Sequence, residues 1–365
     1  MRAGGVGVRI VVFGLTVSSS WGNGHATLWR ALCHALRGLG HEVVFFERNV
    51  PYYASTRDEG PYGCEWVLYD DFDAVRERAE RELSRADAAI VTSYCPDARV
   101  ASELILETTK GVRVFYDLDT PVTLERVRLG EPVDYLPPFG LGDFDLVLSF
   151  AGGPALDAIR EQFGAKRVAP LYGSVDLAAY RPVQNQAPRA ELSYLGTYAA
   201  DRHDTFRAFF LDVARDNPAR AFLVGGAMYP QDEVWPANVR HLPHVPPPAH
   251  STFFASSRLT LSVTRRPMMR FGYCPSGRIF EAAACATPIV SDAFPGIEAF
   301  FEPGREILVA RSKDDVEMAI RLDDGALARI GCAARERVLA DHSSQARARE
   351  LVELLSSPTS VVSRS

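Results

Sequence analysis

Residues 259–292 carry the clearest signal of the fold, and they read LTLSVTRRPMMRFGYCPSGRIFEAAACATPIVSD. An apolar run that begins at Leu259 predicts one strand, and a second run at Pro288–Ser291 predicts another. Between them, the polar Ser276 followed by an alanine-rich segment predicts the start of a helix. A strand, a helix and a strand in this order predict two parallel strands joined by a crossover helix, as in an α/β sheet.

Basic residues gather between the first predicted strand and the helix. The predicted loop holds Arg265, Arg266 and Arg270, and Arg278 falls in the first helical turn. A helix N-terminus, here at Ser276 and Gly277, exposes N–H groups and a partial positive charge, and guanidinium groups bind phosphate through paired hydrogen bonds. One turn later, the carboxylate of Glu281 can accept hydrogen bonds from a vicinal diol such as ribose. We interpret the segment as a site for a nucleoside diphosphate.

The same segment has a purely structural alternative. An alanine-rich helix between two buried strands is a common way to pack a helix on a sheet, and the arginines would then lie at the surface. Glu281 fits this alternative poorly, because a carboxylate between Phe280 and Ala282 is seldom buried without a partner. The residues therefore favour ligand binding and leave the packing role open.

Residues 280–291, FEAAACATPIVS, resemble the donor-site fingerprint of GT-B glycosyltransferases of families 4 and 1. The stretch GSVDLAAYRP at 173–182 resembles the junction between the two domains of these enzymes. The motif LGT at 195–197, with Arg202 after it, resembles the glycine loop that opens their second domain. Within GT-B proteins, the chain is most similar to the CgeB-like group, through YDLDTPVTL (116–124), LSFAGGP (148–154) and LGTY (195–198).

The resemblance implies an α/β protein of the GT-B type, with two Rossmann-like, doubly wound domains facing a cleft. It assigns residues 1–180 to an acceptor domain, 181–342 to a nucleotide-sugar donor domain, and 343–365 to a C-terminal helix and flexible tail. On the positions that match the family's motifs, the donor site would consist of Gly196, Thr197, Arg202, Arg266, Ser276, Gly277, Arg278 and Glu281.

Apolar runs and turn residues elsewhere agree with two strand–helix–strand series. In the first, we predict strands at 8–13, 42–46, 88–91, 112–116, 146–150 and 167–170, and helices at 26–37, 72–84, 97–108 and 154–163. A Pro/Gln-rich patch at 181–189 follows. In the second, we predict strands at 192–195, 221–224 and 239–242, and helices at 204–216, 250–256 and 343–355. Such alternation is typical of parallel sheets with helices on both faces.

Loops at the carboxyl ends of the first domain's strands carry the acceptor-side candidates, since ligands of open α/β sheets bind there. His25, which follows Gly22, Asn23 and Gly24, and Asp119, in YDLDTP, are candidate general bases toward an acceptor hydroxyl. Gly152 and Gly153 would let the acceptor approach the backbone. Each candidate has a structural alternative: His25 starting a helix, Asp119 capping a turn, and the glycines forming a strand-to-helix turn.

Composition and charge exclude several classes of protein. With 365 residues, 47% of them hydrophobic, the chain can bury two sizeable cores. A net charge of −6 argues against general nucleic-acid binding. The six cysteines include no CxxC pair, and the N-terminal apolar run is too short to span a membrane. We therefore expect a cytoplasmic protein without a disulfide framework, a signal peptide or a transmembrane segment.

We also expect no metal and no cofactor. Asp117 and Asp119 match a D-x-D pattern in letters, but they lie in the predicted acceptor domain. The histidines His241, His244 and His250 are spaced irregularly around a run of three prolines, which is a poor arrangement for metal ligands.

The predicted function is the metal-independent transfer of a sugar from a UDP- or dTDP-type donor to a hydroxyl of a small molecule or glycan. Many retaining GT-B enzymes carry a second glutamate eight residues before the ribose-binding one, and this chain has Tyr273 there. The stereochemistry is therefore left open, as are the sugar, the acceptor and the oligomeric state. The alternatives are a sugar-nucleotide epimerase or hydrolase of the same fold, and a non-catalytic pseudo-glycosyltransferase that only binds.

Overall fold

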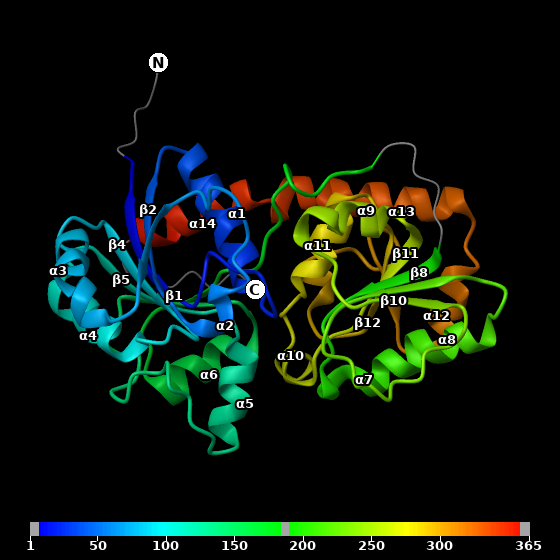
Figure 1. Cartoon of the computed structure of the whole chain (residues 1–365), viewed down its shortest axis with the longest axis horizontal. Coiled ribbons are helices and arrows are strands. Elements are labelled where there is room, and N and C mark those ends of the chain that lie inside the picture. The colour runs from blue at the N-terminus through cyan, green and yellow to red at the C-terminus, as the bar shows by residue number, and fades with distance from the viewer. Residues whose placement is uncertain (1–6, 184–189, 358–365) are drawn as a thin grey trace. The chain divides into compact units, whose positions relative to one another are not determined.

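A computed structural model of the chain describes residues 7–183 and 190–357 (Figure 1). The chain divides into two compact units. The first consists of Met1–Tyr172 together with Ser344–Ser365, and the second of Gly173–Ser343. Each unit is built around a parallel sheet of its own.

In the first unit, the described residues form a sheet with the strand order β3-β2-β1-β4-β5-β6-β7, and every neighbouring pair is parallel. The strands are β1 (Arg9–Gly14), β2 (Glu42–Arg48), β3 (Glu65–Tyr69), β4 (Ala88–Thr92), β5 (Val112–Asp117), β6 (Leu146–Ser149) and β7 (Val168–Pro170). The order reverses beside β1, and this switch point is where open α/β sheets bind ligands.

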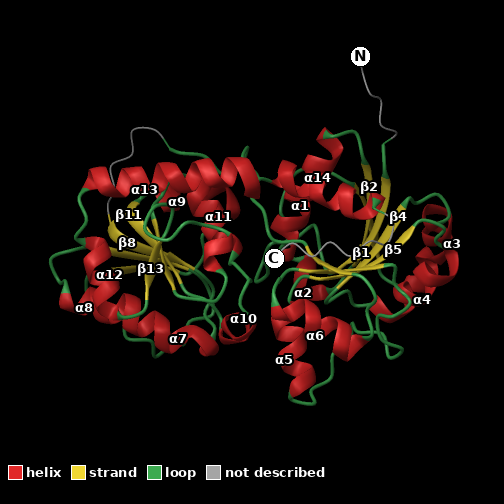
Figure 2. Ribbon diagram, turned by 180° about the vertical axis from the view of Figure 1, so that it is seen from behind, coloured by secondary structure: helices red, strands yellow, loops and turns green. Residues whose placement is uncertain are grey.

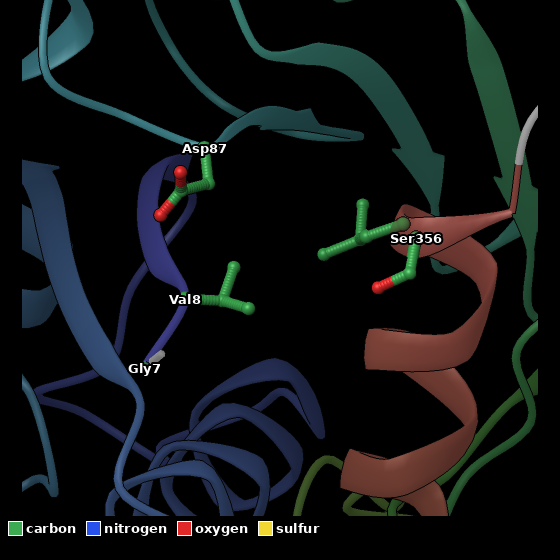
Figure 3. Close-up of a pocket in the computed structure, with 5 residues that line it drawn as sticks. Gly7, Val8, Asp87 and Ser356 are labelled. Atoms are coloured by element: carbon green, nitrogen blue, oxygen red, sulfur yellow. The ribbon is translucent and has the colours of Figure 1, made fainter. Parts of the chain in front are cut away.

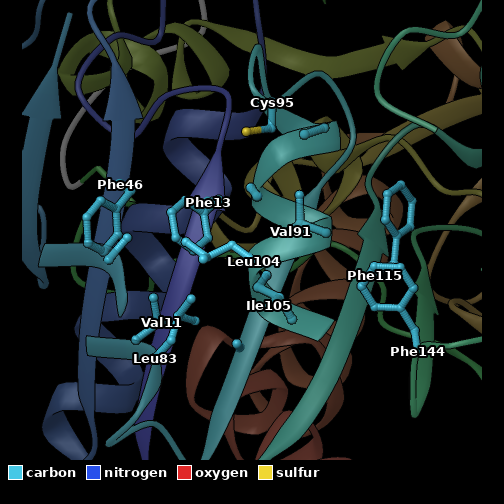
Figure 4. Packing of buried hydrophobic residues seen from close by; sticks show 14 of the residues in the cluster. Val11, Phe13, Phe46, Leu83, Val91, Cys95, Leu104, Ile105, Phe115 and Phe144 are labelled. Carbon is cyan, nitrogen blue, oxygen red and sulfur yellow. The ribbon is translucent and has the colours of Figure 1, made fainter. Parts of the chain in front are cut away.

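Helices cover both faces of the first sheet. The helices of this unit are α1 (His25–Gly38), α2 (Pro51–Ala54), α3 (Phe72–Leu83), α4 (Ala98–Thr108), α5 (Thr120–Arg128), α6 (Pro154–Phe163) and α14 (Ser344–Ser356). Because side chains alternate along a strand, Val11 and Phe13 of β1 face α3 and α4 (Figure 4), whereas Ile10 and Val12 face α1 and α14. The helix predicted at residues 343–355 therefore completes the core of the first unit.

In the second unit, the described residues form a parallel sheet with the order β10-β9-β8-β11-β12-β13. The strands are β8 (Ala190–Leu195), β9 (Phe222–Gly225), β10 (Val239–Leu242), β11 (Ser257–Ser262), β12 (Ile289–Asp292) and β13 (Leu308–Ala310). The helices are α7 (Ala200–Phe206), α8 (Asp212–Asp216), α9 (His250–Ala255), α10 (Arg266–Phe271), α11 (Gly277–Ala284), α12 (Lys313–Ile320) and α13 (Asp324–Arg337) (Figure 2). Two π-helical turns, Arg207–Leu211 and Val338–His342, extend these helices.

The sequence did not predict β3, β13, α2, α5, α12 and α13, and three further differences bear on the site or on the domain boundary. The loop predicted around Arg266 and Arg270 is the helix α10, which begins with Arg266 and a proline in the first turn, where the missing N–H costs no hydrogen bond. The helix predicted at residues 204–216 begins earlier, at Ala200, and contains a π-helical turn. Residues 173–180, predicted to end the first domain, lie in the second unit, where Tyr180 is buried. The tail expected after residue 357 and part of the patch at 181–189 lie outside the described residues.

Candidate functional site

In the second unit, the predicted donor residues lie where β8 and β11 end and α11 begins. Ser276 is the N-cap of α11, and its hydroxyl accepts a hydrogen bond from the backbone N–H of Arg278 at 3.4 Å. Gly277 is the first helical residue. A capped N-terminus still directs its remaining N–H groups outward, along the positive end of the helix dipole. The local structure expected for this segment of the sequence is therefore present.

Glu281 is buried, one helical turn beyond this N-terminus, and it is paired. Its Oε2 accepts a hydrogen bond from Nη1 of Arg278 and lies 3.4 Å from Nδ1 of His250. Burial alone would raise the pKa of the Glu281 carboxyl, but the charge of Arg278 and the contact with His250 outweigh it and lower the pKa to about 2. Glu281 is thus an ionised carboxylate inside the unit, with both of these contacts on a single oxygen.

His250, at the start of α9, is a member of this group that the sequence did not predict. It is 3% exposed, and its Nε2 lies 3.1 Å from the carbonyl oxygen of Val245. Its Nδ1 lies 3.0 Å from Oη of Tyr180 and 3.2 Å from Nη1 of Arg278. In the sequence, His250 stood out only as one of three irregularly spaced histidines, and nothing in that spacing connects it with Glu281.

Arg202, in α7, is held between the ends of two neighbouring strands. Its guanidinium donates hydrogen bonds to the carbonyl oxygens of Thr197, after β8, and Val263, after β11, and lies 5.8 Å from the ring centre of Tyr194. At Gly196, a Cβ atom would lie 2.7 Å from the hydroxyl of Tyr194, so the glycine permits a close approach of chain segments here. Arg202 is a preplaced cation at the carboxyl end of the second sheet.

The other basic residues of the segment differ in their surroundings. Arg265 forms an ion pair with Asp201 at 2.9 Å, whereas Arg266 is exposed at the start of α10. Tyr273, at the position of the absent second glutamate, has a φ of +45°, and Gly272 before it has a φ of +67°. Glycine adopts such a φ freely, but for Tyr273 it strains the backbone, and such strain is often found at binding sites.

In the first unit, the structure brings together the two candidate bases. Nε2 of His25, at the start of α1, lies 2.8 Å from Oδ2 of Asp119, although the two residues are 94 positions apart in sequence. His25 is 8% exposed, and its Nδ1 is buried without a hydrogen-bond partner among the described residues. Asp119 occupies the N-cap position of α5 but makes no side-chain cap hydrogen bond, because its carboxylate faces His25 instead.

The loop before His25 is held rigidly by side chains. Oδ1 of Asn23 accepts hydrogen bonds from the backbone N–H groups of His25, at 3.0 Å, and Ala26, at 3.3 Å. Gly22 has a φ of +69°, which favours glycine, and Gly24 is the N-cap of α1. Asn23 and its flanking glycines therefore position His25, which is the local role that the structural alternative gave them.

A buried carboxylate, Glu47 at the end of β2, anchors the start of the same loop. It accepts hydrogen bonds from the hydroxyls of Thr16 and Ser18, from the backbone N–H groups of Val17 and Ser18, and from the indole of Trp66. Its residue is 1% exposed. All five donors are neutral, so hydrogen bonds rather than an ion pair compensate for burial of this group.

The remaining candidates in the first unit lie beside the His25–Asp119 pair or after β6. Asp117 is buried, its Oδ1 accepts a hydrogen bond from the backbone N–H of Asp119 at 3.0 Å, and burial raises the pKa of its carboxyl to about 6. Gly153 has a φ of +56° immediately before α6, and a Cβ at Gly152 would lie 2.0 Å from the hydroxyl of Tyr172. The two glycines are thus required by the strand-to-helix turn and its packing; a contact with an acceptor stays a prediction.

Among residues 7–183 and 190–357, no group of three or more His, Cys, Asp or Glu side chains is placed to hold a metal ion. A hollow of about 240 Å³ in the first unit is lined by Gly7, Val8, Asp87, Leu355 and Ser356 (Figure 3). Gly7 and Val8 precede β1, and Asp87 precedes β4, so the hollow is at the amino ends of these strands. His25 and Asp119 follow the carboxyl ends of β1 and β5, at the opposite edge of the sheet.

Comparisons with known proteins agree with this architecture. Residues 202–353 match the family model described as "Glycosyl transferase-like". No curated protein sequence matches the chain. Within the described part of the chain, no helix is both long enough and apolar enough to cross a membrane.

Several solved structures share the fold over nearly their whole length. An alpha-glucosyltransferase in complex with UDP and a DNA 13-mer is 12% identical with a TM-score of 0.68, and the match covers 96% of this chain and 100% of that one. HepE of Anabaena, in complex with UDP and glucose, is 13% identical with a TM-score of 0.66, covering 96% and 99%. Sucrose-phosphate synthase of Thermosynechococcus elongatus is 14% identical with a TM-score of 0.63, covering 95% and 98%.

At such identities, the likeness establishes the fold, and the narrower resemblance to the CgeB-like group stays a prediction. Three observations support the same fold: the two parallel sheets, the N-capped helix α11 that carries Glu281, and the match over residues 202–353. The chain has the GT-B fold of glycosyltransferases, and its residues 202–353 carry the sequence pattern of the glycosyl transferase-like family.

Proposed function

We propose that the protein is a glycosyltransferase that moves a sugar from a nucleoside diphosphate donor to a hydroxyl acceptor without the help of a metal ion. The observation that carries the proposal is the arrangement around α11: an arginine at a capped helix N-terminus and, one turn later, a buried carboxylate whose pKa is about 2. HepE and the alpha-glucosyltransferase, which share the fold, are complexes with UDP, and this supports a UDP-type donor here, with a dTDP-type donor as the alternative.

The second unit would bind the donor. Arg202, Arg266 and Arg278, with the N–H groups at the start of α11, would neutralise the diphosphate as the bond between it and C1 of the sugar breaks. Stabilisation of developing charge by fixed dipoles and cations is usually the largest single contribution to catalysis. Arg202 is already fixed by two carbonyl oxygens, so little reorganisation is needed when the ligand arrives.

Glu281 would bind the ribose of the donor. Its contacts with Arg278 and His250 both fall on Oε2, so Oε1 can accept hydrogen bonds from the two ribose hydroxyls. A phosphate that attracts Arg278 would take that guanidinium away from Glu281, and the ribose hydroxyls would replace its hydrogen bond. The exposed fraction of the Arg278 side chain, 37%, is compatible with such a movement.

The first unit would bind the acceptor and receive its proton. For an inverting transfer, the acceptor oxygen forms a bond to C1 while its proton passes to the His25–Asp119 pair. The side chain of Asp119 is 24% exposed and that of His25 10%, so Asp119 is the member that a substrate reaches more directly. The close pairing lets one group take the proton while the other stabilises the resulting charge.

A thermal-shift screen followed by turnover measurements tests the proposal. Ligands that bind only the folded state raise its stability with the logarithm of their concentration over Kd. We expect UDP or dTDP and their sugar conjugates to stabilise the protein, and a suitable acceptor to cause release of the nucleoside diphosphate. Stabilisation by none of a panel of nucleotides would contradict the proposal.

The two alternatives give different results in the same assay. Free sugar released without an acceptor would indicate a hydrolase, and interconversion of the nucleotide sugar would indicate an epimerase. Binding without turnover in the presence of a broad acceptor panel would support a pseudo-glycosyltransferase. A transferase releases nucleoside diphosphate in proportion to a glycosylated product, which mass spectrometry detects.

A further inference from the structure

We propose that His250, fixed by Tyr180, is the positioning residue that holds Glu281 in place for the ribose and so gives the donor site its preference for ribonucleotides. This inference rests on the proposed function, because it assumes that Glu281 binds the ribose. It adds two residues to the donor site that the fold alone does not assign. It also names what they control: discrimination at the 2′ and 3′ hydroxyls.

The orientation of the His250 ring follows from its partners. The carbonyl oxygen of Val245 can only accept a hydrogen bond, so Nε2 of His250, 3.1 Å away, carries a proton and donates it. This contact fixes the ring and directs Nδ1 toward Tyr180, Arg278 and Glu281, at 3.0, 3.2 and 3.4 Å. With 3% exposure, the ring has little room to turn away.

Two groups contact Oε2 of Glu281, and they differ in how freely their side chains can move. Arg278 is partly exposed and carries the charge that a phosphate attracts, whereas His250 is buried and fixed by the backbone. When Arg278 turns toward a phosphate, His250 remains beside the carboxylate. Once the guanidinium has left, a proton taken up from solvent on Nδ1 makes the ring a donor at both nitrogens, and this N–H donates to Oε2, which keeps Oε1 aimed at the ligand. A buried carboxylate with no such partner would be costly.

Tyr180 supplies a second contact that fixes His250. It lies in the segment 173–182, and its residue is 7% exposed. Its hydroxyl lies 3.0 Å from Nδ1, and burial together with the charge of Glu281 raises the pKa of the phenol well above its usual value, so the hydroxyl stays protonated. It donates to Nδ1 while the ring is neutral, and its oxygen accepts from Nδ1 when that nitrogen carries a proton. Ser251, next to His250 on α9, also donates to the carbonyl oxygen of Ala179 in this segment at 3.1 Å. The segment is therefore attached to α9 through the histidine and through the residue that follows it.

A purely structural role for His250 is the competing explanation, and ligand discrimination separates the two. A variant that only loosens the fold weakens all nucleotides by a similar factor. A variant that misplaces Glu281 loses affinity for the ribonucleotide and leaves the affinity for the deoxynucleotide nearly unchanged, because the deoxy ligand gains less from Glu281. The ratio of the two dissociation constants is therefore the quantity to measure.

The experiment uses calorimetry with UDP, 2′-deoxy-UDP and 3′-deoxy-UDP on the full-length protein. We expect the wild type to prefer UDP by about tenfold or more, the range for hydrogen bonds to a charged group. His250→Ala should bring the ratio close to one. Tyr180→Phe, which removes one hydroxyl, should give an intermediate ratio, and His250→Gln, which keeps an N–H donor, should restore part of the preference.

Ser256→Ala, at the half-buried C-cap of the same helix, is the matched control and should keep the wild-type ratio. A folded His250→Ala protein that still prefers UDP by the wild-type factor would overturn this inference and leave the proposed function standing. A wild type that binds all three ligands equally would overturn the ribose role of Glu281, and this inference with it.

Discussion

The carboxyl edges of the two sheets have the same architecture and opposite chemistry. In the first unit, His25 is paired with Asp119 beside the buried carboxyl of Asp117. In the second, Arg202 and Arg278 are held by carbonyl oxygens and by the carboxylate of Glu281. One edge presents an imidazole and carboxylates, which can exchange protons, and the other presents guanidinium cations, which can neutralise an anion. The same fold unit thus supplies a place for ligands, and the residues in its loops decide which ligand and which chemistry.

The two edges share one device, a buried carboxylate that holds a loop. Glu47, at the end of β2, accepts hydrogen bonds from the loop that follows β1. Asp292, at the end of β12, accepts hydrogen bonds from the backbone N–H of Thr264 at 3.0 Å and from its hydroxyl at 2.8 Å, in the loop that follows β11. In both units, therefore, the neighbouring strand fixes the loop that leads to candidate site residues.

The largest expected effect tests the proton-exchanging edge. Replacing His25 with Ala, or Asp119 with Asn, should lower kcat about 10²–10⁴-fold, the usual contribution of a general base, and leave the Kd for the nucleotide unchanged. Steady-state kinetics with calorimetry on the same samples measures both quantities. If either variant weakened nucleotide binding as strongly as turnover, the assignment of separate chemistries to the two units would be wrong.

The next effect concerns the buried carboxyl of the first unit. Because the pKa of Asp117 is raised from 3.8 to about 6, the folded state holds a proton that the unfolded state releases between these values, so stability falls as pH rises from about 4 to 6. The loss should be up to about 3 kcal/mol. Asp117→Asn should remove this fall in urea unfolding curves at pH 4 to 7, whereas the exposed Asp73→Asn should retain it.

The carboxylate of the second unit should behave in the opposite way. The pKa of Glu281 is lowered to about 2, so its stabilising contribution is complete above the unfolded value of 4.5 and is lost as pH falls toward 2. Near neutral pH, Glu281→Ala should weaken UDP binding by about 1–3 kcal/mol through lost hydrogen bonds. Unchanged UDP affinity in a folded variant, measured by calorimetry, would refute the ribose contact.

The smallest expected effect is that of metal removal, which should not change the rate of transfer. If arginines and a helix N-terminus neutralise the diphosphate, then EDTA should leave the rate of transfer unchanged within about twofold, and added Mn²⁺ should not accelerate it. The measurement is turnover after dialysis against chelator, with an enzyme known to need a metal as the assay control. Activity that is lost in EDTA and restored by Mn²⁺ would contradict the metal-independent mechanism and would make Asp117 and Asp119 candidate metal ligands.

Much of the fold could be predicted because its strands are continuous apolar runs. The predicted strand at residues 112–116 and the helix at 154–163 agree with β5 and α6 within one residue. The helix α10 was missed because arginines and Pro267 within six residues resemble a loop, and the helix is too short to show a periodicity. Short elements of this kind are decided by packing and capping rather than by pattern.

The candidate site could be predicted residue by residue but not as an arrangement. His25 and Asp119 were each identified from their position after a strand, and their 2.8 Å contact depends on the adjacency of β1, β4 and β5, which no local pattern encodes. His250 gave no signal, because its role comes from Val245, Tyr180 and Glu281 around it. Pairing between distant segments is a property of the sheet order.

The packing of α14 has a consequence for how the protein is made. Ala348, Leu351 and Leu355 complete a core whose other members include residues of β1, α1 and β5, so this core is complete only after residues 344–356 have been synthesised. The second unit is continuous in sequence, from Gly173 to Ser343. Domains tend to fold during synthesis in the order in which they emerge from the ribosome. Synthesis of the first unit therefore begins before that of the second unit and is completed after it. Until α14 has been synthesised, the apolar face that this helix covers stays exposed.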